Sequence, residues 1–165
     1  MYSPQQLIVG ITNEFNILKH LGSKVSEANH IHKLTDPQRS IQELEHYIIS
    51  SFPAQIMAMV AWSMDDTIYM EYIGKFSDFS YDQFGAELDR SLAIITAEIT
   101  SLTESAWSEE ITMWGGKTAA RSVFLIDYVF AFLGAYKMQL FLQLKHSGLS
   151  DLGTMNLWAG IDAPK

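Results

Sequence analysis

The first 25 residues carry apolar side chains at alternating spacings of three and four positions, the repeat of an amphipathic helix. Ser3 suits the N-cap, Pro4 suits the first helical position, and Gln6 completes a capping-box pattern. We therefore expect a helix of about seven turns to begin here. Its predicted buried face consists of Leu7, Ile11, Phe15, Leu18, Leu21 and Val25.

A second helical pattern follows a connection over residues 29–36. It begins at Pro37 or Ser40, and Ser40 with Glu43 forms another capping-box pattern. Pro53 lies inside this pattern, and proline removes a backbone donor and clashes with the preceding turn, so a kink or break is predicted near residues 50–53. The predicted buried face consists of Ile41, Leu44, Ile48, Phe52, Ile56, Met59 and Val60.

The periodicity fades between Ser63 and Ser80, which predicts a long surface connection that contains at most short helical pieces. A third amphipathic helix then begins, with Ser80 as its cap and Gln83 three residues later. Its predicted buried face consists of Phe84, Leu88, Leu92, Ile95, Ile99 and Leu102.

The last helix is predicted to follow a loop over residues 107–117 that has room for a short hairpin. Thr118 is its expected cap and Gly148 its expected stop. The tail over residues 149–165 contains Met155, Leu157 and Trp158, so we expect it to pack back on the helices. Aromatic or apolar side chains recur at four-residue steps along the last helix: Phe124, Tyr128, Phe132, Tyr136 and Leu140.

Four long amphipathic helices predict an all-α four-helix bundle. Its connection between helices two and three is long enough to cross the bundle, and its C-terminal tail is packed. With 165 residues, the chain fits a single domain over residues 1–165.

Composition narrows the range of partners and sites. The formal net charge is −8, with 11 basic residues scattered among 19 acidic ones, which disfavours nucleic acid and anionic membrane surfaces as partners. The chain has no cysteine, which excludes disulfides, thiolate metal sites and thiol nucleophiles. Its first residues lack the pattern of a signal peptide, so a cytoplasmic location is expected.

An almost continuous apolar run over residues 123–136 could be mistaken for a membrane span. Spanning requires about 20 apolar residues, and this run is shorter and contains Asp127. A bundle helix is therefore predicted, with no membrane partner.

Two short motifs invite chemical interpretations that their context does not support. The string over residues 115–118 resembles the end of a P-loop, but the motif requires glycine where Ile111 stands, and a preceding strand in an α/β fold. Two Glu-x-x-His pairs resemble half of a di-iron site, which would also need Glu98 and Asp127. The pairs are Glu27 with His30 and Glu43 with His46. Nothing in the sequence spacing requires these two pairs to converge with Glu98 and Asp127 on one site.

The polar residues that remain are assigned more simply. His30 and His32 are expected to be solvated loop residues, and His20 and His146 exposed helix positions. No serine stands beside a histidine in a hydrolase elbow. His46 lies near an apolar face, and Asp127 stands among apolar neighbours, where a carboxylate must face a polar cavity, pair with a neighbour or turn to the surface.

The segments Arg39–His46 and Tyr136–Leu140 resemble the DinB-like (YfiT-like) family of four-helix bundles. In that family three histidines, one on helix two and two on the last helix, bind nickel, zinc or a similar ion. His46 matches the first, but Phe132 and Tyr136 occupy the other two positions. Phenylalanine offers no ligand atom, and tyrosine, with a pKa of about 10, is a poor ligand at neutral pH.

The resemblance therefore implies the family fold with a degenerate metal site. Its metal-bearing members include thiol S-transferases, a maleylpyruvate isomerase and predicted hydrolases. Homodimers are common among them, so the resemblance implies a homodimer and a possible small-molecule ligand for this chain. We expect no cofactor here. Nickel or zinc would bind only through an unorthodox ligand set, such as His46 with Glu43, Asp127 or a partner chain.

Three functions follow from this pattern. The first is binding of a small molecule or a partner in a bundle pocket formed by His46, Tyr128, Phe132 and Tyr136, with Asp127 as a fifth candidate. The second is metal-free catalysis, with His46 as general acid or base and the Tyr136 hydroxyl as donor. The third is a transferase or hydrolase that uses a metal held by His46.

Overall fold

The computed structural model describes residues 2–61, 66–75 and 79–164. Its helices are α1 (Pro4–Gly22), α2 (Ile41–Ala61), α3 (Asp66–Lys75), α4 (Phe84–Ser101), α5 (Glu104–Ser108), α6 (Arg121–His146) and α7 (Thr154–Trp158). A two-stranded antiparallel hairpin, β1 (Glu110–Thr112) and β2 (Thr118–Ala120), separates α5 from α6. The predicted all-α class is confirmed.

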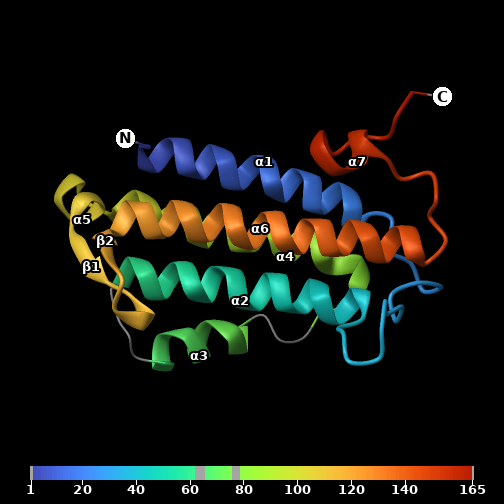
Figure 1. Ribbon diagram of the computed structural model, residues 1–165, viewed down its shortest axis with the longest axis horizontal. Coiled ribbons are helices and arrows are strands. Elements are labelled where there is room, and N and C mark those ends of the chain that lie inside the picture. Colours follow the sequence, from blue (N-terminus) through green and yellow to red (C-terminus); the bar gives the residue numbers. More distant parts are fainter. Residues whose placement is uncertain (1, 62–65, 76–78, 165) are drawn as a thin grey trace.

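Four long helices surround the core. α1 packs on α4 and α6, and α2 packs on the same two helices, so α1 and α2 lie on opposite corners of the bundle. Figure 1 shows α6 in front of α4, with α1 and α2 on either side of it. Because α2 and α4 are neighbours, the segment between them need not cross the bundle. It carries α3 along the outside of α2.

The predicted start of α1 is confirmed. Ser3 Oγ accepts a hydrogen bond from the Gln6 backbone N–H at 3.2 Å, and Gln6 Oε1 accepts one from the Ser3 N–H at 2.9 Å. This reciprocal pair satisfies two of the helix's free donors. The helix ends at Gly22, so Val25 lies beyond it in the following turns.

Of the predicted kink or break at Pro53, the break is wrong, because α2 runs without interruption from Ile41 to Ala61. Proline costs a helix about 3 kcal/mol. Most α2 side chains on both sides of Pro53 are buried, and that packing offsets the local cost. The predicted capping box at Ser40 and Glu43 is present.

The connection after α2 contains a helix, α3, that is longer than the sequence pattern predicts. α3 has 10 residues, which exceeds the short helical pieces expected between Ser63 and Ser80. Residues 62–65 and 76–78 of that connection lie outside the described residues. Beyond them, a single 3₁₀ turn at Tyr81–Gln83 leads into α4, and Gln83 Oε1 accepts a hydrogen bond from the Ser80 N–H at 3.0 Å.

The prediction that Thr118 caps the last helix is wrong. Thr118 lies in β2 opposite Thr112, with the two hydroxyl oxygens 2.9 Å apart, and α6 begins three residues later. The hairpin turn needs left-handed backbone at Gly115 and Gly116, whose φ angles are 83° and 77°. The P-loop-like string is therefore a hairpin turn.

The C-terminal tail packs back on the bundle, as predicted. Leu152 and Leu157 are buried, and α7 lies against α1. The Asn156 amide donates to Asp162 at 2.9 Å, and Asp162 in turn pairs with Lys24, which follows α1, at 2.8 Å.

Candidate functional site

His46 is half-buried and turns toward the segment that precedes α4. Its Nε2 lies 2.7 Å from the carbonyl oxygen of Phe79, and the two rings are 4.2 Å apart. A carbonyl oxygen only accepts, so Nε2 carries a proton, and in the neutral ring the lone pair lies on Nδ1. His46 is thus fixed in one tautomer.

Tyr47 takes the place opposite α6 where the sequence hypothesis put His46. Its ring lies 5.0 Å from Tyr136 and 5.8 Å from Phe132. Consecutive helix residues point about 100° apart, so His46 and Tyr47 face different neighbours. Among the described residues, the aromatic contact of His46 is with Phe79 and that of Tyr136 is with Tyr47 and Phe132.

The aromatic residues between α2 and α6 form one continuous group, which we call the aromatic seam. Phe132 is its centre, with ring centroids 4.4 Å from Tyr136, 5.4 Å from Tyr128 and 5.4 Å from Phe52. Phe52 and Tyr128 are stacked at 5.9 Å. The members of the seam are Tyr47, Phe52, Tyr128, Phe132 and Tyr136.

The hydroxyl groups of Tyr128 and Tyr136 stay neutral at physiological pH. Burial, reinforced by a hydrogen bond with Tyr47, raises the pKa of Tyr136, and burial raises the pKa of Tyr128 further above its usual range. The Tyr128 hydroxyl is buried and has no hydrogen-bond partner among the described residues. The Arg39 guanidinium lies 3.9 Å from the centre of the Tyr47 ring, a cation–π contact at the exposed edge.

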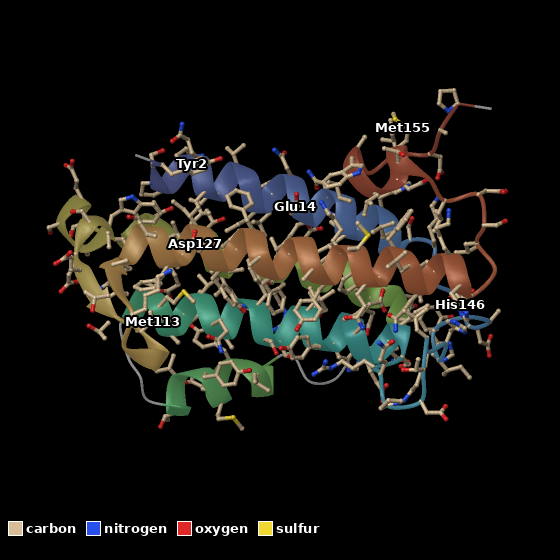
Figure 2. The ribbon with its side chains drawn as sticks, viewed as in Figure 1. Tyr2, Glu14, Met113, Asp127, His146 and Met155 are labelled. Atoms are coloured by element: carbon tan, nitrogen blue, oxygen red, sulfur yellow. The ribbon has the colours of Figure 1, made fainter. Side chains whose placement is uncertain are left out.

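Tyr128 also lines a shallow, open cavity of about 360 Å³ where α2, the hairpin and α6 meet. Its apolar walls come from Met59, Met113 and Phe124, and Lys117 and Asp127 supply the charges. Asp127 is exposed, so of the three alternatives for its carboxylate it takes the surface. Figure 2 shows Met113 and Asp127 at the end of the bundle opposite to His146.

The predicted pocket residues therefore fall into three groups. Tyr128, Phe132 and Tyr136 lie together in the seam, Asp127 joins Tyr128 at the cavity, and His46 faces Phe79. Three larger cavities among the described residues, of about 510, 480 and 450 Å³, contain none of the five. They lie beside Trp107 and the start of α1, along α5 beside Glu109, and beside Lys24 and the residues after α6.

The donor set does not suit a three-ligand metal centre. Within residues 2–61, 66–75 and 79–164, no three His, Asp or Glu side chains converge as a metal-binding group. Glu43 points to solvent and pairs with Lys33 at 3.2 Å, and the hydrogen bond from the Ser40 backbone lowers its pKa. Glu27 and His30 of the first Glu-x-x-His pair lie in turns beyond the end of α1.

Glu45 is a buried acid that the sequence analysis missed. Its side chain is fully buried, neither carboxyl oxygen has a hydrogen-bond partner among the described residues, and burial raises its pKa to about 9. It lies beside Phe84 and the end of α1 at Gly22, away from α6. The signal was present, because position 45 shares the three- and four-residue spacing of Ile41, Ile48 and Phe52.

Among the other histidines, His20 differs from its predicted exposure. It is largely covered by the tail, with Nε2 3.0 Å from the Asn156 amide, and burial lowers its pKa. His32 lies in a loop and His146 is exposed at the end of α6, as predicted, and their ring nitrogens are 2.8 Å apart. His30 stacks on Tyr81 at 5.0 Å.

Comparison with known proteins identifies the fold. No protein-family model and no curated protein matches the chain. A DinB-like protein from Bacillus subtilis, YjoA, superposes with a TM-score of 0.67 at 18% identity, over 90% of this chain and 95% of that one. A mutant of a mycothiol-dependent maleylpyruvate isomerase superposes with a TM-score of 0.57 at 14% identity, over 86% of this chain but only 60% of its own. The chain has the DinB-like fold.

Proposed function

We propose that this protein is a DinB-like family member without the family's metal centre, and that it binds a small, partly apolar molecule in the shallow cavity where α2, the hairpin and α6 meet. The observation that carries the proposal is that Tyr128 joins the aromatic seam to the Met-lined cavity. The fold shared with two DinB-like structures supports the family assignment.

The side chains at the family's ligand positions argue for loss of the metal. Two of the three positions hold Phe132 and Tyr136, and the Tyr136 hydroxyl, with its raised pKa, is a poorer metal ligand than free tyrosine. Sites of this kind use three protein ligands. His46 alone would hold zinc or nickel weakly.

The cavity walls indicate the chemistry of the ligand. Met59, Met113 and Phe124 offer an apolar surface, and methionine adapts its shape to irregular or flat ligands. Lys117 and Asp127 supply one charge of each sign at the same cavity. A planar, apolar molecule with one polar or acidic group fits this set.

Methionine methyl NMR tests this proposal directly. We expect indole, phenol or benzoate to shift the methyl signals of Met59 and Met113, which line the cavity, and to leave the exposed Met138 and Met155 unchanged. Met113→Gln should weaken the response, whereas Met155→Gln on α7 serves as the matched control. Equal shifts at all methionines, or none at the cavity, would reject the site.

Elemental mass spectrometry tests the absence of a structural metal. Untagged protein purified without chelators should hold less than about a tenth of an equivalent of nickel, zinc or manganese, and added metal should not raise the melting temperature. Near-stoichiometric metal that is lost in His46→Ala would instead show a centre built on unorthodox ligands.

Catalysis through His46 is the second candidate, and the fixed tautomer favours it. The contact of Nε2 with the Phe79 oxygen leaves Nδ1 free to accept a proton, as a general base must. The activity named for the isomerase concerns that protein, and it gives a starting assay of thiol-dependent isomerisation and transfer. A turnover that survives in His46→Ala would remove this mechanism.

The remaining expectations about cellular context stay predictions. The acidic balance of the chain supports the absence of nucleic-acid and anionic-membrane partners. A cytoplasmic location is proposed beside it. Fractionation of the source cells tests the location.

A further inference from the structure

A cavity of about 510 Å³ lies between α5 and the first residues of the chain, and no described residue lines both it and the cavity at Tyr128. Figure 1 shows α5 at the same end of the bundle as the start of α1, and Figure 2 places Tyr2 there. Pockets for small molecules span about 300–1,000 Å³. The cavity is therefore a second candidate ligand site. It is lined by residues 2–4, Leu102, Glu104, Trp107 and Ser108.

The aromatic walls of this cavity are tied to the rest of the bundle. The Trp107 indole N–H donates to the Tyr2 carbonyl oxygen at 3.0 Å, which joins α5 to the segment before α1. Thr103 Oγ1 accepts a hydrogen bond from the Ala106 N–H at 3.1 Å and caps α5. The Tyr2 ring meets Phe130 of α6 edge-on, with the ring centroids 6.2 Å apart. Because these contacts fix the walls before a ligand binds, they lower the entropic cost of binding.

Glu104 carries the only charge among the described residues that line the cavity. Its backbone oxygen accepts a hydrogen bond from the Ser108 hydroxyl at 2.8 Å, but its carboxylate has no ion-pair or hydrogen-bond partner within the described residues. Glu109, beyond the end of α5, provides a contrast, because it pairs with Arg121 at 2.6 Å. An anionic ligand would meet a like charge in this cavity, whereas a cation would gain the free carboxylate.

The remaining walls suit the apolar body of such a cation. Trp and Tyr rings both attract ammonium groups, and Trp107 and Tyr2 supply one of each. Pro4 and Leu102 add aliphatic surface. We propose that this cavity, which we call the α5 cavity, binds a small organic cation. Its ammonium group lies at the Glu104 carboxylate, and its apolar body lies against Trp107 and Leu102.

Charge also separates the α5 cavity from the cavity at Tyr128. Lys117 and Asp127 give the cavity at Tyr128 one charge of each sign, whereas the described walls of the α5 cavity hold a carboxylate and no cation. The net charge of −8 acts in the same direction, because it raises the concentration of cations near the protein. The two cavities should therefore select ligands of different charge, and each serves as a control for the other.

Three non-planar probes of similar shape and different charge test the proposal: cyclohexylmethylamine, cyclohexylmethanol and cyclohexanecarboxylate. NMR titration follows the indole N–H signal of Trp107, assigned by triple-resonance spectroscopy. The amine should shift this signal and bind at least about tenfold more tightly than the alcohol, and the carboxylate should cause no shift. The methyl signals of Met59 and Met113 should stay in place, because those residues line the other cavity.

Exposed acids at this end of the molecule provide the variants. Glu104→Gln should bring the amine and the alcohol to within about twofold of each other, and Glu104→Lys should make the carboxylate the preferred probe. Glu110→Gln removes the same charge from an exposed position of β1 outside the cavity and should preserve the preference for the amine. Equal binding of the three probes, a preference for the amine that survives in Glu104→Gln, or shifts at Met59 and Met113 with Trp107 unchanged would overturn the proposal. Circular dichroism confirms that each variant is folded.

Discussion

Glu45 and Tyr47 stand two residues apart on α2 and face different parts of the core. Glu45 points toward α1 and α4, where it meets Phe84 and the end of α1 and finds no hydrogen-bond partner among the described residues. Tyr47 points toward α6, where it meets Tyr136, Phe132 and the Arg39 guanidinium. Each side buries an oxygen group without a hydrogen-bond partner among the described residues, the Glu45 carboxyl on one side and the Tyr128 hydroxyl on the other, but only the Tyr47 side adds a cation, the Arg39 guanidinium.

This difference shows where a ligand is more easily accommodated. On the Tyr47 side, rings supply contact area, hydroxyls supply hydrogen bonds and a cavity opens at Tyr128. On the Glu45 side the acid is enclosed by apolar atoms and stays protonated at neutral pH. The first environment suits recognition, whereas the second carries a cost in stability that the rest of the core must offset.

Removal of the ring at the centre of the seam should have the largest effect. Phe132→Ala deletes contacts with Tyr47, Phe52, Tyr128 and Tyr136 and leaves a cavity, so the free energy of unfolding should fall by about 3–5 kcal/mol. Urea denaturation measures this loss. A loss below about 1 kcal/mol would mean that the seam is not a packed part of the core.

Glu45 should make the stability depend on pH. Its pKa is about 9 in the folded protein and 4.5 in the unfolded chain, so the folded state keeps a proton that the unfolded state releases. The contribution of Glu45 to stability is therefore greatest below pH 4.5 and falls as the pH rises toward 9. Between pH 5 and pH 7 the loss is about 3 kcal/mol, at about 1.4 kcal/mol per pH unit.

Glu43 provides the matched control for this titration. Its pKa is lowered, first by the Ser40 backbone hydrogen bond, so its contribution is present above the unfolded pKa and is lost as the pH falls. Glu45→Gln should remove the fall in stability between pH 5 and pH 7, and Glu43→Gln should leave it. Identical pH profiles for wild type and Glu45→Gln would show that Glu45 is ionised in the folded protein.

The two tyrosines at positions 128 and 136 differ in how deeply their side chains are buried. Tyr128→Phe removes a buried hydroxyl that has no hydrogen-bond partner among the described residues, and it should raise the free energy of unfolding by about 1 kcal/mol. Tyr136→Phe removes a hydroxyl from a half-buried residue and should change the free energy of unfolding by less than about 0.5 kcal/mol. Urea denaturation measures both values, and a loss of stability in Tyr128→Phe contradicts this assignment.

Much of the fold could be predicted because helical periodicity and capping residues are local signals. The Ser3 and Ser40 capping boxes, and the stripes of α1, α2 and α4, needed only neighbouring residues. The start of α6 was missed because Thr118 is also a good hairpin residue, and only its pairing with Thr112 decides between the two. Continuity through Pro53 likewise depends on packing from distant helices.

The candidate site was harder to predict because adjacent residues of one helix differ in what they face. The spacing of Phe132 and Tyr136 placed both on one face of α6, and both lie in the seam. For α2, a motif match selected His46, whereas the neighbouring Tyr47 is the residue that contacts α6. The rotation of α2 about its axis determines whether His46 or Tyr47 faces Tyr136. That rotation cannot be predicted from the local sequence pattern.

Substitution of His46 by glutamine should have the smallest effect on stability, and it tests whether the two sides of α2 are separate environments. If His46 only ties α2 to the segment before α4, His46→Gln, whose amide can still donate to the Phe79 oxygen, should preserve stability, and His46→Ala should lose about 1 kcal/mol. Neither variant should alter the shifts that indole causes at Met59 and Met113, because those residues line a cavity on the α6 side. Loss of the indole response in both variants, with the fold intact, would place His46 in the ligand site and join the two sides of α2 into one pocket.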